Sequence, residues 1–408
     1  MKKSEGISTA IAVLAIIVTV ATGASAQNIH DTRLLTQPAI SDKHIAFAYA
    51  GDLWIANTSG SEVRRLTSHI GRETNPRFSP DGSLVAFSAQ YEGGSDVYVV
   101  PVEGGIPRRL TWHPGSDVVQ SFTQDGEAVL FTSARAVFTN RFTQLFTVSV
   151  EGGHPEQLPI PNASKAAYSP DGSFIAYTPL GERFLQWKNY RGGTVSRIWI
   201  YNTLNHEVEQ IPQPEGRCND TDPMWLEDTV YFRSDRNGEF NLFSYNPRSS
   251  ELIQLTGHDD FPILNTSAGG GRIVYEQAGY LHIYDPGTSS ASKLTIGVAA
   301  DFTEVRTRFE EGGNFIRNAD ISPSGARAVF EFRGEIVTVP AEKGDNRYIT
   351  TTSGVHERSP AWSPDGNSIA FFSDLSGEYV LHIINQDGRG DVRTFPIEGA
   401  GFYEDPRW

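Results

Sequence analysis

The chain has 408 residues, of which 38% are hydrophobic and 11% aromatic, so it can bury substantial cores and a disordered chain is excluded. Its 34 basic and 49 acidic residues give a net charge of −15, which repels nucleic acid and offers no basic patch to anionic lipid. We therefore expect neither nucleic acid nor, once the leader described next is removed, a membrane as partner. Cys218 is the only cysteine, so packing rather than an internal disulfide must hold the fold.

Residues 1–26 have the features of a secretory signal peptide. Lys2 and Lys3 supply a positive start, residues 10–21 form an uncharged apolar run, and Ala24-Ser25-Ala26 is a small-residue cleavage site. An uncleaved anchor helix is the alternative, but the run is shorter than the roughly 20 residues that a membrane span needs. Cleavage would leave 32 basic and 48 acidic residues. We expect a periplasmic or secreted protein.

A three-part phrase then recurs along the chain. Its first part is a short apolar run ending in an aromatic residue, found at 45–47, 85–87, 129–131, 175–177, 230–232, 273–275, 328–330 and 369–371. Its second part is another β-rich run, found at 53–55, 97–99, 145–147, 198–200, 242–244, 281–283, 336–338 and 381–383. The third part is a polar pair before Leu or Ile and usually Thr, as in Arg64-Arg65-Leu66-Thr67. Eight copies of the first two parts indicate a repeat protein.

Turn sequences introduce several of these runs. Ser-Pro-Asp-Gly occurs at 79–82, 169–172 and 363–366, with weaker versions at 123–126 and 322–325. Proline presets φ at the second turn position and glycine accepts a positive φ at the fourth. The aspartate can accept hydrogen bonds from nearby backbone amides, so we expect it to be structural. Asn237-Gly238, between two β-rich runs, predicts a tight hairpin turn.

The spacing of the repeats predicts a β-propeller. The Leu or Ile of the third part recurs at 66, 110, 158, 211, 255, 294 and 349, in steps of 39 to 55 residues. Units of this length that contain several short strands are typical of propeller blades. Helical solenoids share the period, but these runs are β-branched and aromatic, with glycine and proline at their bounds. We predict an all-β fold in which residues 28–302 form a six-bladed β-propeller.

The rest of the chain predicts a second repeat array. Residues 303–318 are charged and contain glycine, so we interpret them as a linker before an array that occupies residues 319–408. Asp405-Pro406-Arg407-Trp408 matches the lead-in Asn75-Pro76-Arg77-Phe78, which runs into a new strand. Two blades alone would leave an apolar face uncovered. We expect the first two blades of a second, truncated propeller in the front part of a longer protein.

No motif in the sequence indicates a catalytic, cofactor-binding or metal-binding residue. G-x-S-x-G, H-E-x-x-H, P-loop and G-x-G-x-x-G patterns are absent from the sequence, and the ten histidines lack metal-ligand spacing. His282 and His382 occupy equivalent repeat positions, which favours a structural role. Residues 235–239 faintly resemble a calcium loop, but a hairpin explains them better. We predict no catalytic site, no cofactor and no metal in this chain.

One insertion stands out in the fourth repeat. Residues 184–194 (FLQWKNYRGGT) form an aromatic and basic segment between two strand runs. It could dock a peptide or another domain, or it could be a long loop whose aromatic residues pack on their own blade. The sequence leaves both interpretations open.

Three stretches resemble the amino-terminal propeller of tricorn-type serine peptidases. They are residues 75–115, residues 187–200 (WKNYRGGTVSRIWI), and residues 220–245 with the phrases DTDPMW and YFRSDRNGEFNLFSY. The Ser-Pro-Asp-Gly turns are weakly specific, whereas the W-K-x-Y-R-G-G-T run is much more so. The likeness covers essentially the whole chain after residue 26.

The resemblance implies a six-bladed propeller, a seven-bladed one, and then helical, PDZ-like and catalytic domains. Members are serine peptidases that degrade oligopeptides, with propellers that guide substrate and product, and their catalytic residues lie in the carboxy-terminal part. Paired arginines after the second blade anchor the substrate carboxylate in the archaeal archetype. The corresponding residues here, 113–121, contain no arginine, so this role does not transfer.

Three functions follow from these observations. The first is the substrate-gating propeller portion of a periplasmic tricorn-like serine peptidase, whose partners are peptides and its own carboxy-terminal domains, with an oligomer possible. The second is a non-catalytic binding propeller that resembles the Tol-system periplasmic protein. The third is a propeller fused to an amidohydrolase or to a prolyl-oligopeptidase-like domain.

Overall fold

The computed structural model describes residues 28–138, 141–302, 312–399 and 401–408. The chain divides into two compact units, residues 1–304 and 305–408. The predicted signal peptide, residues 1–26, lies outside the described residues. Within the described ranges, no helix has the length and apolar character needed to cross a membrane.

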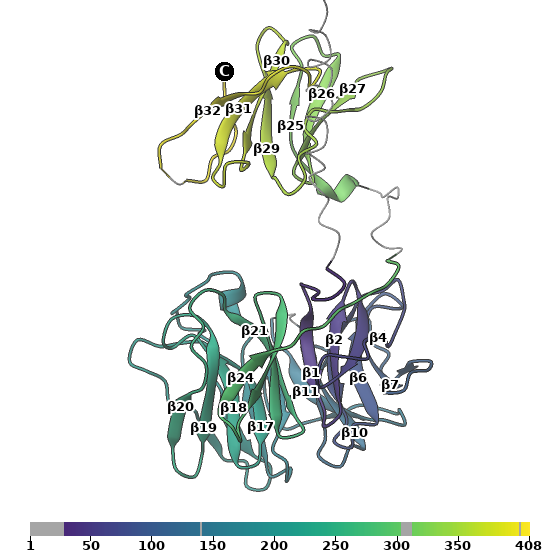
Figure 1. Ribbon diagram of the computed structural model, residues 1–408, viewed down its shortest axis with the longest axis vertical. Coiled ribbons are helices and arrows are strands. Elements are labelled where there is room, and N and C mark those ends of the chain that lie inside the picture. The colour runs from purple at the N-terminus through teal and green to yellow at the C-terminus, as the bar shows by residue number, and fades with distance from the viewer. Residues whose placement is uncertain (1–27, 139–140, 303–311, 400) are drawn as a thin grey trace, which may run out of the picture. The chain divides into compact units, whose positions relative to one another are not determined.

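The first unit contains six antiparallel sheets, each built from four consecutive strands (Figure 1). The first three sheets are β1 (Thr36–Ile40), β2 (His44–Tyr49), β3 (Asp52–Asn57) and β4 (Arg64–Arg65); β5 (Glu73–Phe78), β6 (Leu84–Ala89), β7 (Asp96–Pro101) and β8 (Arg108–Arg109); and β9 (Asp117–Phe122), β10 (Ala128–Ser133), β11 (Gln144–Ser149) and β12 (Glu156–Gln157). The other three are β13 (Lys165–Tyr168), β14 (Phe174–Thr178), β15 (Trp199–Asn202) and β16 (Val208–Gln210); β17 (Asp220–Leu226), β18 (Thr229–Ser234), β19 (Asn241–Asn246) and β20 (Glu251–Gln254); and β21 (Ile263–Gly269), β22 (Arg272–Gln277), β23 (Tyr280–Asp285) and β24 (Ser290–Lys293).

The repeated phrase maps onto these strands in a constant way. The first part forms the second strand of each sheet, the second part forms the third strand, and the polar pair forms the short outermost strand. Helical structure among the described residues is confined to two 3-10 turns, Arg183–Leu185 and Gly313–Phe315. The predicted all-β propeller class is confirmed.

The six sheets form a ring. Each innermost strand contacts the innermost strand of the next sheet, in the order β1, β5, β9, β13, β17 and β21, and β21 returns to β1. A separate cluster of buried apolar side chains lies between each pair of neighbouring sheets. Each sheet therefore buries its apolar faces against its two neighbours.

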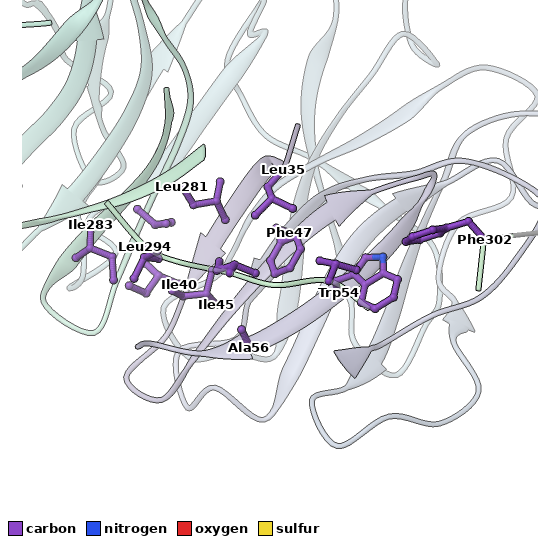
Figure 2. Packing of buried hydrophobic residues seen from close by; sticks show 13 residues of the cluster. Leu35, Ile40, Ile45, Phe47, Trp54, Ala56, Leu281, Ile283, Leu294 and Phe302 are labelled. Atoms are coloured by element: carbon purple, nitrogen blue, oxygen red, sulfur yellow. The ribbon is translucent and has the colours of Figure 1, made fainter. Parts of the chain in front are cut away.

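The ring closes through side-chain packing and a few hydrogen bonds, because no sheet among the described residues combines strands from both ends of the unit. Figure 2 shows Phe47 and Trp54 of the first sheet in one cluster with Leu281 of the sixth and with Phe302. The backbone N–H of Thr32 donates to the Ile296 carbonyl at 2.8 Å. The Thr32 hydroxyl accepts the N–H of Val298 at 2.9 Å.

The innermost strands share an irregularity that the sequence predictions did not include. A register shift interrupts their pairing in five of the six sheets, for example between Thr36 and Ala39. In three of these strands the residue before a proline has a positive φ, as at Gln37 (φ 51) and Asn75 (φ 53). The N–H of Gln37 donates to Glu276, and that of Asn75 donates to the Gln37 side chain at 2.8 Å. Side chains of the preceding sheet thus satisfy the N–H groups that the bulges free from the ladder.

The second unit contains two more four-stranded sheets. They are β25 (Ile316–Ile321), β26 (Arg327–Phe332), β27 (Glu335–Pro340) and β28 (Arg347–Tyr348), and β29 (Glu357–Trp362), β30 (Ser368–Ser373), β31 (Val380–Asn385) and β32 (Arg393–Phe395). An apolar cluster that includes Val329, Trp362 and Phe371 packs between them. Strand β25 begins at Ile316, inside the expected linker 303–318, of which residues 303–311 lie outside the described residues.

Candidate functional site: the axial channel of the six-sheet ring

The innermost strands enclose two connected cavities on the axis of the ring. A cavity of about 140 Å³ is lined by β5, β9, β13, β17 and β21, and one of about 300 Å³ is lined by residues from all six sheets, including the turns that follow these strands. Residues that line both cavities are Arg77, Ser121, Phe122, Tyr168, Trp225, Ser267 and Ala268. Because the two cavities share these residues, we treat them as one axial channel.

Two basic side chains line the narrower part of the channel. Arg77 on β5 donates through Nε to the Gln120 carbonyl and through Nη1 to the Pro76 carbonyl, both at 2.8 Å. Lys165 on β13 lies with its Nζ 3.2 Å from Oδ1 of Asp222 on β17. Burial lowers the pKa of Arg77, whereas Asp222 raises the pKa of Lys165. Arginine keeps its proton in proteins, and the raised pKa keeps Lys165 protonated, so both side chains are positively charged at neutral pH.

Asp222 is the acidic centre of this network. Its Oδ2 accepts a hydrogen bond from Nε of Arg233, whose Nη2 lies 3.0 Å from Oε1 of Glu182. Burial acts to raise the pKa of Asp222, but Arg233 and Lys165 outweigh it and hold that pKa well below its ordinary range. A buried carboxylate flanked by two cations stays ionised, so these four side chains form a fixed charge network.

A second hydrogen-bonding centre joins the sixth sheet to the first. Oε2 of Glu276 on β22 accepts hydrogen bonds from the Thr36 hydroxyl and from Asn265 Nδ2, both at 2.7 Å. The N–H of Gln37 also donates to it, at 3.3 Å. Glu276 therefore ties the innermost strand of the first sheet to the sixth.

The channel presents charged and hydroxyl groups to its interior. Cationic and anionic side chains lie beside hydroxyl groups, and the Ser121 hydroxyl has no partner among the described residues. A nucleophile needs an adjacent general base within hydrogen-bond reach. Among the described residues, Ser41 of the lining bonds to backbone atoms of His44, and no serine hydroxyl of the lining bonds to a histidine ring nitrogen. The site can accept and donate hydrogen bonds to a passing polar chain such as a peptide backbone.

The insertion at 184–194 is attached to the fifth sheet. Phe184 is buried and packs on Phe240 with ring centroids 4.7 Å apart, while Leu185 and Trp187 are exposed. Arg191 lies with its Nη1 2.7 Å from Oδ2 of Asp235, which anchors the basic part of the loop. The insertion thus buries one aromatic ring and exposes Trp187, and its docking role stays a prediction. The packing is on the next blade rather than on its own.

The turn at 235–239 is held by protein groups. Asp235 accepts hydrogen bonds from the backbone and side-chain amides of Asn219, at 2.7 and 2.9 Å, in addition to Arg191. The connection between β18 and β19 spans residues 235–240, longer than the predicted tight hairpin, and Gly238 (φ 120) closes a turn in it by donating its N–H to the Asp235 carbonyl at 3.2 Å. Within the described ranges, no group of three or more His, Cys, Asp or Glu side chains could hold a metal ion.

His282 and His382 each pack on the aromatic ring of the cross-strand partner, stacked for His282 and edge-on for His382. His282 pairs with Tyr275 across β23 and β22 with ring centroids 5.1 Å apart, and His382 pairs with Phe371 at 5.6 Å. Burial lowers the pKa of both, to about 4 for His282. Both are therefore neutral packing groups at pH 7.

Residues 113–121 lead into and form most of β9. Gln120 in this strand lines the narrower cavity, and the segment presents no arginine to it. Arg135, at the end of the neighbouring strand, lies with its Nη2 2.5 Å from Oδ2 of Asp117.

Sequence reasoning missed the channel residues. Arg77 and Asp222 both lie in the x-Pro lead-ins that precede strand runs, and these lead-ins form the innermost strands. The sequence did contain a signal for these residues, because the x-Pro lead-in recurs along the chain and Arg77 and Asp222 are charged residues within it. Arg233 and Glu182 gave none, because their proximity depends on the packing of the fourth and fifth sheets.

A family model and two curated relatives indicate the same family. Residues 32–290 match the family of the tricorn protease N-terminal beta propeller domain. The chain is 29% identical to a tricorn protease homolog of Saccharolobus solfataricus, over 87% of this chain and 32% of that protein. It is 30% identical to a putative tricorn protease homolog 2 of Streptomyces coelicolor, over 86% of this chain and 30% of that protein. The chain thus spans about a third of the length of these curated relatives.

A solved structure supports the fold. The crystal structure of the tricorn protease superposes with a TM-score of 0.60 at 20% identity, covering 89% of this chain and 44% of that one. At that identity the likeness concerns the fold alone, and the family model carries the assignment. With its matched region spanning most of the six-sheet ring, this chain belongs to the family of tricorn protease N-terminal β-propeller domains.

Proposed function

We propose that this chain is the propeller portion of a periplasmic tricorn-like serine peptidase that degrades oligopeptides. In this proposal the axial channel guides peptides, and the catalytic residues lie in a part of the protein beyond the 408 residues. The observation that carries the proposal is the family match over residues 32–290, which coincides with the ring that surrounds the channel.

The channel lining supports a role in peptide passage. An extended peptide presents alternating N–H and C=O groups, and the channel offers both cations and carboxylates together with hydroxyl groups. The exposed Leu185 and Trp187 of the insertion 184–194 suit contact with another domain of the same protein. The acidic balance of the chain suits neither nucleic acid nor anionic lipid as partner.

The periplasmic location rests on the leader. Residues 1–26 combine two lysines, a short apolar run and a small-residue cleavage site. We expect the mature protein to begin at Gln27 and to appear in the periplasmic fraction or in the medium. Amino-terminal sequencing of the protein purified from its native cells tests this.

The peptidase assignment is tested by comparing two preparations. The full-length gene product should hydrolyse oligopeptides, and residues 27–408 alone should hydrolyse none. Turnover by residues 27–408, or no peptide hydrolysis by the full-length product, would contradict the proposal.

The guiding role is tested inside the full-length protein. Ser121 lines both cavities, so Ser121→Phe should narrow the channel and lower kcat/KM for long oligopeptides more than for short ones. Thr288→Phe places the same ring on an exposed turn and is the matched control. Equal kcat/KM values for long peptides in both variants would show that these peptides do not pass through the axial channel.

A further inference from the structure

A groove separates the outer parts of the fourth and fifth sheets. Its volume is about 710 Å³, much larger than either part of the axial channel. Phe174 and Ile200 contribute from the fourth sheet, and Trp225 contributes from the fifth. Phe174 and Trp225 stack with ring centroids 6.2 Å apart, so the groove has an apolar and aromatic wall.

Carboxylates surround this apolar wall. Asp171, Glu207, Glu209, Glu227 and Asp228 line the groove. Arg248 is the one basic residue of the lining, and its Nη1 already pairs with Oδ2 of Asp228 at 2.9 Å. The lining therefore carries a net negative charge beside apolar surface.

The first and second sheets have an arginine at one position of the outermost strand, whereas the third, fifth and sixth sheets have Glu156, Ile253 and Ser292 there. Arg64 on the outermost strand of the first sheet donates to the Val102 carbonyl of the second sheet. Arg108, at the same register in the second sheet, donates to the Val150 carbonyl of the third and lies 3.0 Å from Glu151. In both junctions an arginine of the outermost strand crosses to the turn of the next sheet.

The fourth sheet, like the third, has a carboxylate at this position. The strand register shows that Glu209 occupies the same position as Arg64 and Arg108. These residues pair with Ile200, Ile55 and Val99, respectively, on the third strand of their sheets. Glu209 accepts a hydrogen bond from the Tyr245 hydroxyl of the fifth sheet at 2.9 Å. Strand β16 has the sequence Val-Glu-Gln and brings no guanidinium to the turn at Pro247, and the groove occupies this junction.

We propose that this groove binds a basic peptide segment, in which an arginine next to an apolar residue is the recognised unit. The ligand guanidinium takes the place that Arg108 takes two junctions earlier and pairs with Glu209. The neighbouring apolar side chain packs on Phe174 and Trp225. Charge-assisted pairing with a carboxylate favours arginine over a neutral side chain of the same shape.

The groove adjoins the axial channel. Ser169, Pro170 and Trp225 line both the groove and the wider channel cavity. A segment bound in the groove thus lies at the edge of the channel. The inference concerns binding alone and does not require the peptidase assignment, so each can fail without the other.

Isothermal titration calorimetry on the full chain tests the proposal. The probe is acetyl-Leu-Arg-Leu-amide, and the reference is the same peptide with citrulline, which keeps the shape of arginine without its charge. The arginine peptide should bind about tenfold more tightly, and Glu209→Gln should remove most of this difference. Glu209→Arg should abolish binding, because it restores the arginine of the first two junctions.

The matched control is Glu156→Gln, since Glu156 occupies the same register on β12 of the third sheet but does not line the groove. It should bind the arginine peptide as the natural protein does. Equal affinity for the arginine and citrulline peptides would overturn the proposal. So would unchanged binding by a Glu209→Arg variant whose thermal unfolding matches that of the natural protein.

Discussion

At the residue scale, the third part of the repeated phrase has a specific structural task. The N–H of its Leu or Ile donates to the first residue of the second phrase in the same repeat, as Leu255 does to the Leu242 carbonyl at 2.8 Å. The following threonine hydroxyl accepts the N–H of that same residue in four sheets, as Thr256 does for Leu242 at 2.9 Å. The motif attaches the outermost strand to the third strand where regular pairing ends.

Thr256→Val should therefore destabilise the six-sheet unit. Valine keeps the shape of threonine but leaves the buried Leu242 N–H without its acceptor, which costs about 1–3 kcal/mol. The free energy of unfolding from urea titration measures the loss. Thr288→Val, on an exposed turn, is the control and should change this free energy by no more than about 0.5 kcal/mol. Equal losses in the two variants would contradict the role of the hydroxyl.

The charge network of the channel predicts that the free energy of unfolding decreases at acidic pH. The folded-state pKa of Asp222 lies below its ordinary value because of Arg233 and Lys165. Its stabilising contribution is thus present above about pH 4 and is lost as pH falls from there through the folded-state pKa.

Between about pH 7 and about pH 3, the free energy of unfolding should fall less for Asp222→Asn than for the natural protein. Urea unfolding at the two pH values measures this difference. Asp259→Asn removes an exposed carboxylate and should keep the full acid dependence. Identical pH profiles for the natural protein and Asp222→Asn would show that Asp222 does not contribute.

At the scale of elements, the sequence predicted the second and third strands of every sheet. Runs such as Val85-Ala86-Phe87 alternate in facing two neighbouring sheets, so all three residues are buried and the hydrophobic signal is strong. The innermost strands gave a weak signal, because bulges and prolines interrupt their periodicity, as at Asn75-Pro76. The channel residues lie on these strands and were missed for that reason.

The groove was equally hidden from the sequence. Glu209 follows a β-rich run in the fourth repeat as Arg64 and Arg108 do in the first two, but the third part of the fourth repeat is degenerate. Only the pairing of Glu209 with Ile200 fixes the register that makes the comparison with arginine meaningful. Single-residue register cannot be assigned to a three-residue edge strand from its composition.

The last sheet of the second unit contains a buried titratable side chain, that of Glu357. Glu357 begins β29 and is 2% exposed, and its Oε2 has no partner among the described residues. Burial raises its pKa to about 7, and Glu335 and Asp374 act in the same direction. Its equivalent in the first unit, Glu73, is bound by Thr67, Tyr91 and the N–H of Leu53.

The stability of the second unit should accordingly fall as pH rises through about 7, because a raised carboxyl pKa stabilises the fold most fully below about pH 4.5. Glu357→Gln removes the ionisation and should flatten this profile. Hydrogen exchange of the β29 and β30 amides at about pH 5 and about pH 8, corrected for intrinsic rates, measures the effect. A natural profile that is already flat across this range would contradict the prediction.

At the scale of the whole six-sheet unit, closure of the ring is the feature that composition and periodicity could not reveal. The closing contacts join residues near 32 to residues near 297, more than two hundred positions apart. Lys293 pairs with Asp31 at 2.6 Å, and the ring of Phe302 lies 5.5 Å from Tyr49. Phe302 was assigned to the end of the propeller only because the expected linker follows it. Its packing on the first sheet explains why the ring extends that far.

Gly297 is the position at which this closure is most sensitive. A Cβ added there would lie 2.1 Å from the Ile29 carbonyl oxygen and 3.1 Å from the Cα of His30, both backbone atoms that cannot move aside alone. Gly297→Ala should therefore separate the segment near residue 30 from the segment near residue 297. Amide exchange at Thr32 and Val298, which donate across the closure, should accelerate more than exchange at β10, on the far side of the ring. Gly193→Ala is the control, because an added Cβ there meets no atom within 4 Å. If Thr32 and Val298 exchange at the natural rate in Gly297→Ala, then these backbone contacts do not hold the ring shut and the apolar cluster of Figure 2 closes it alone.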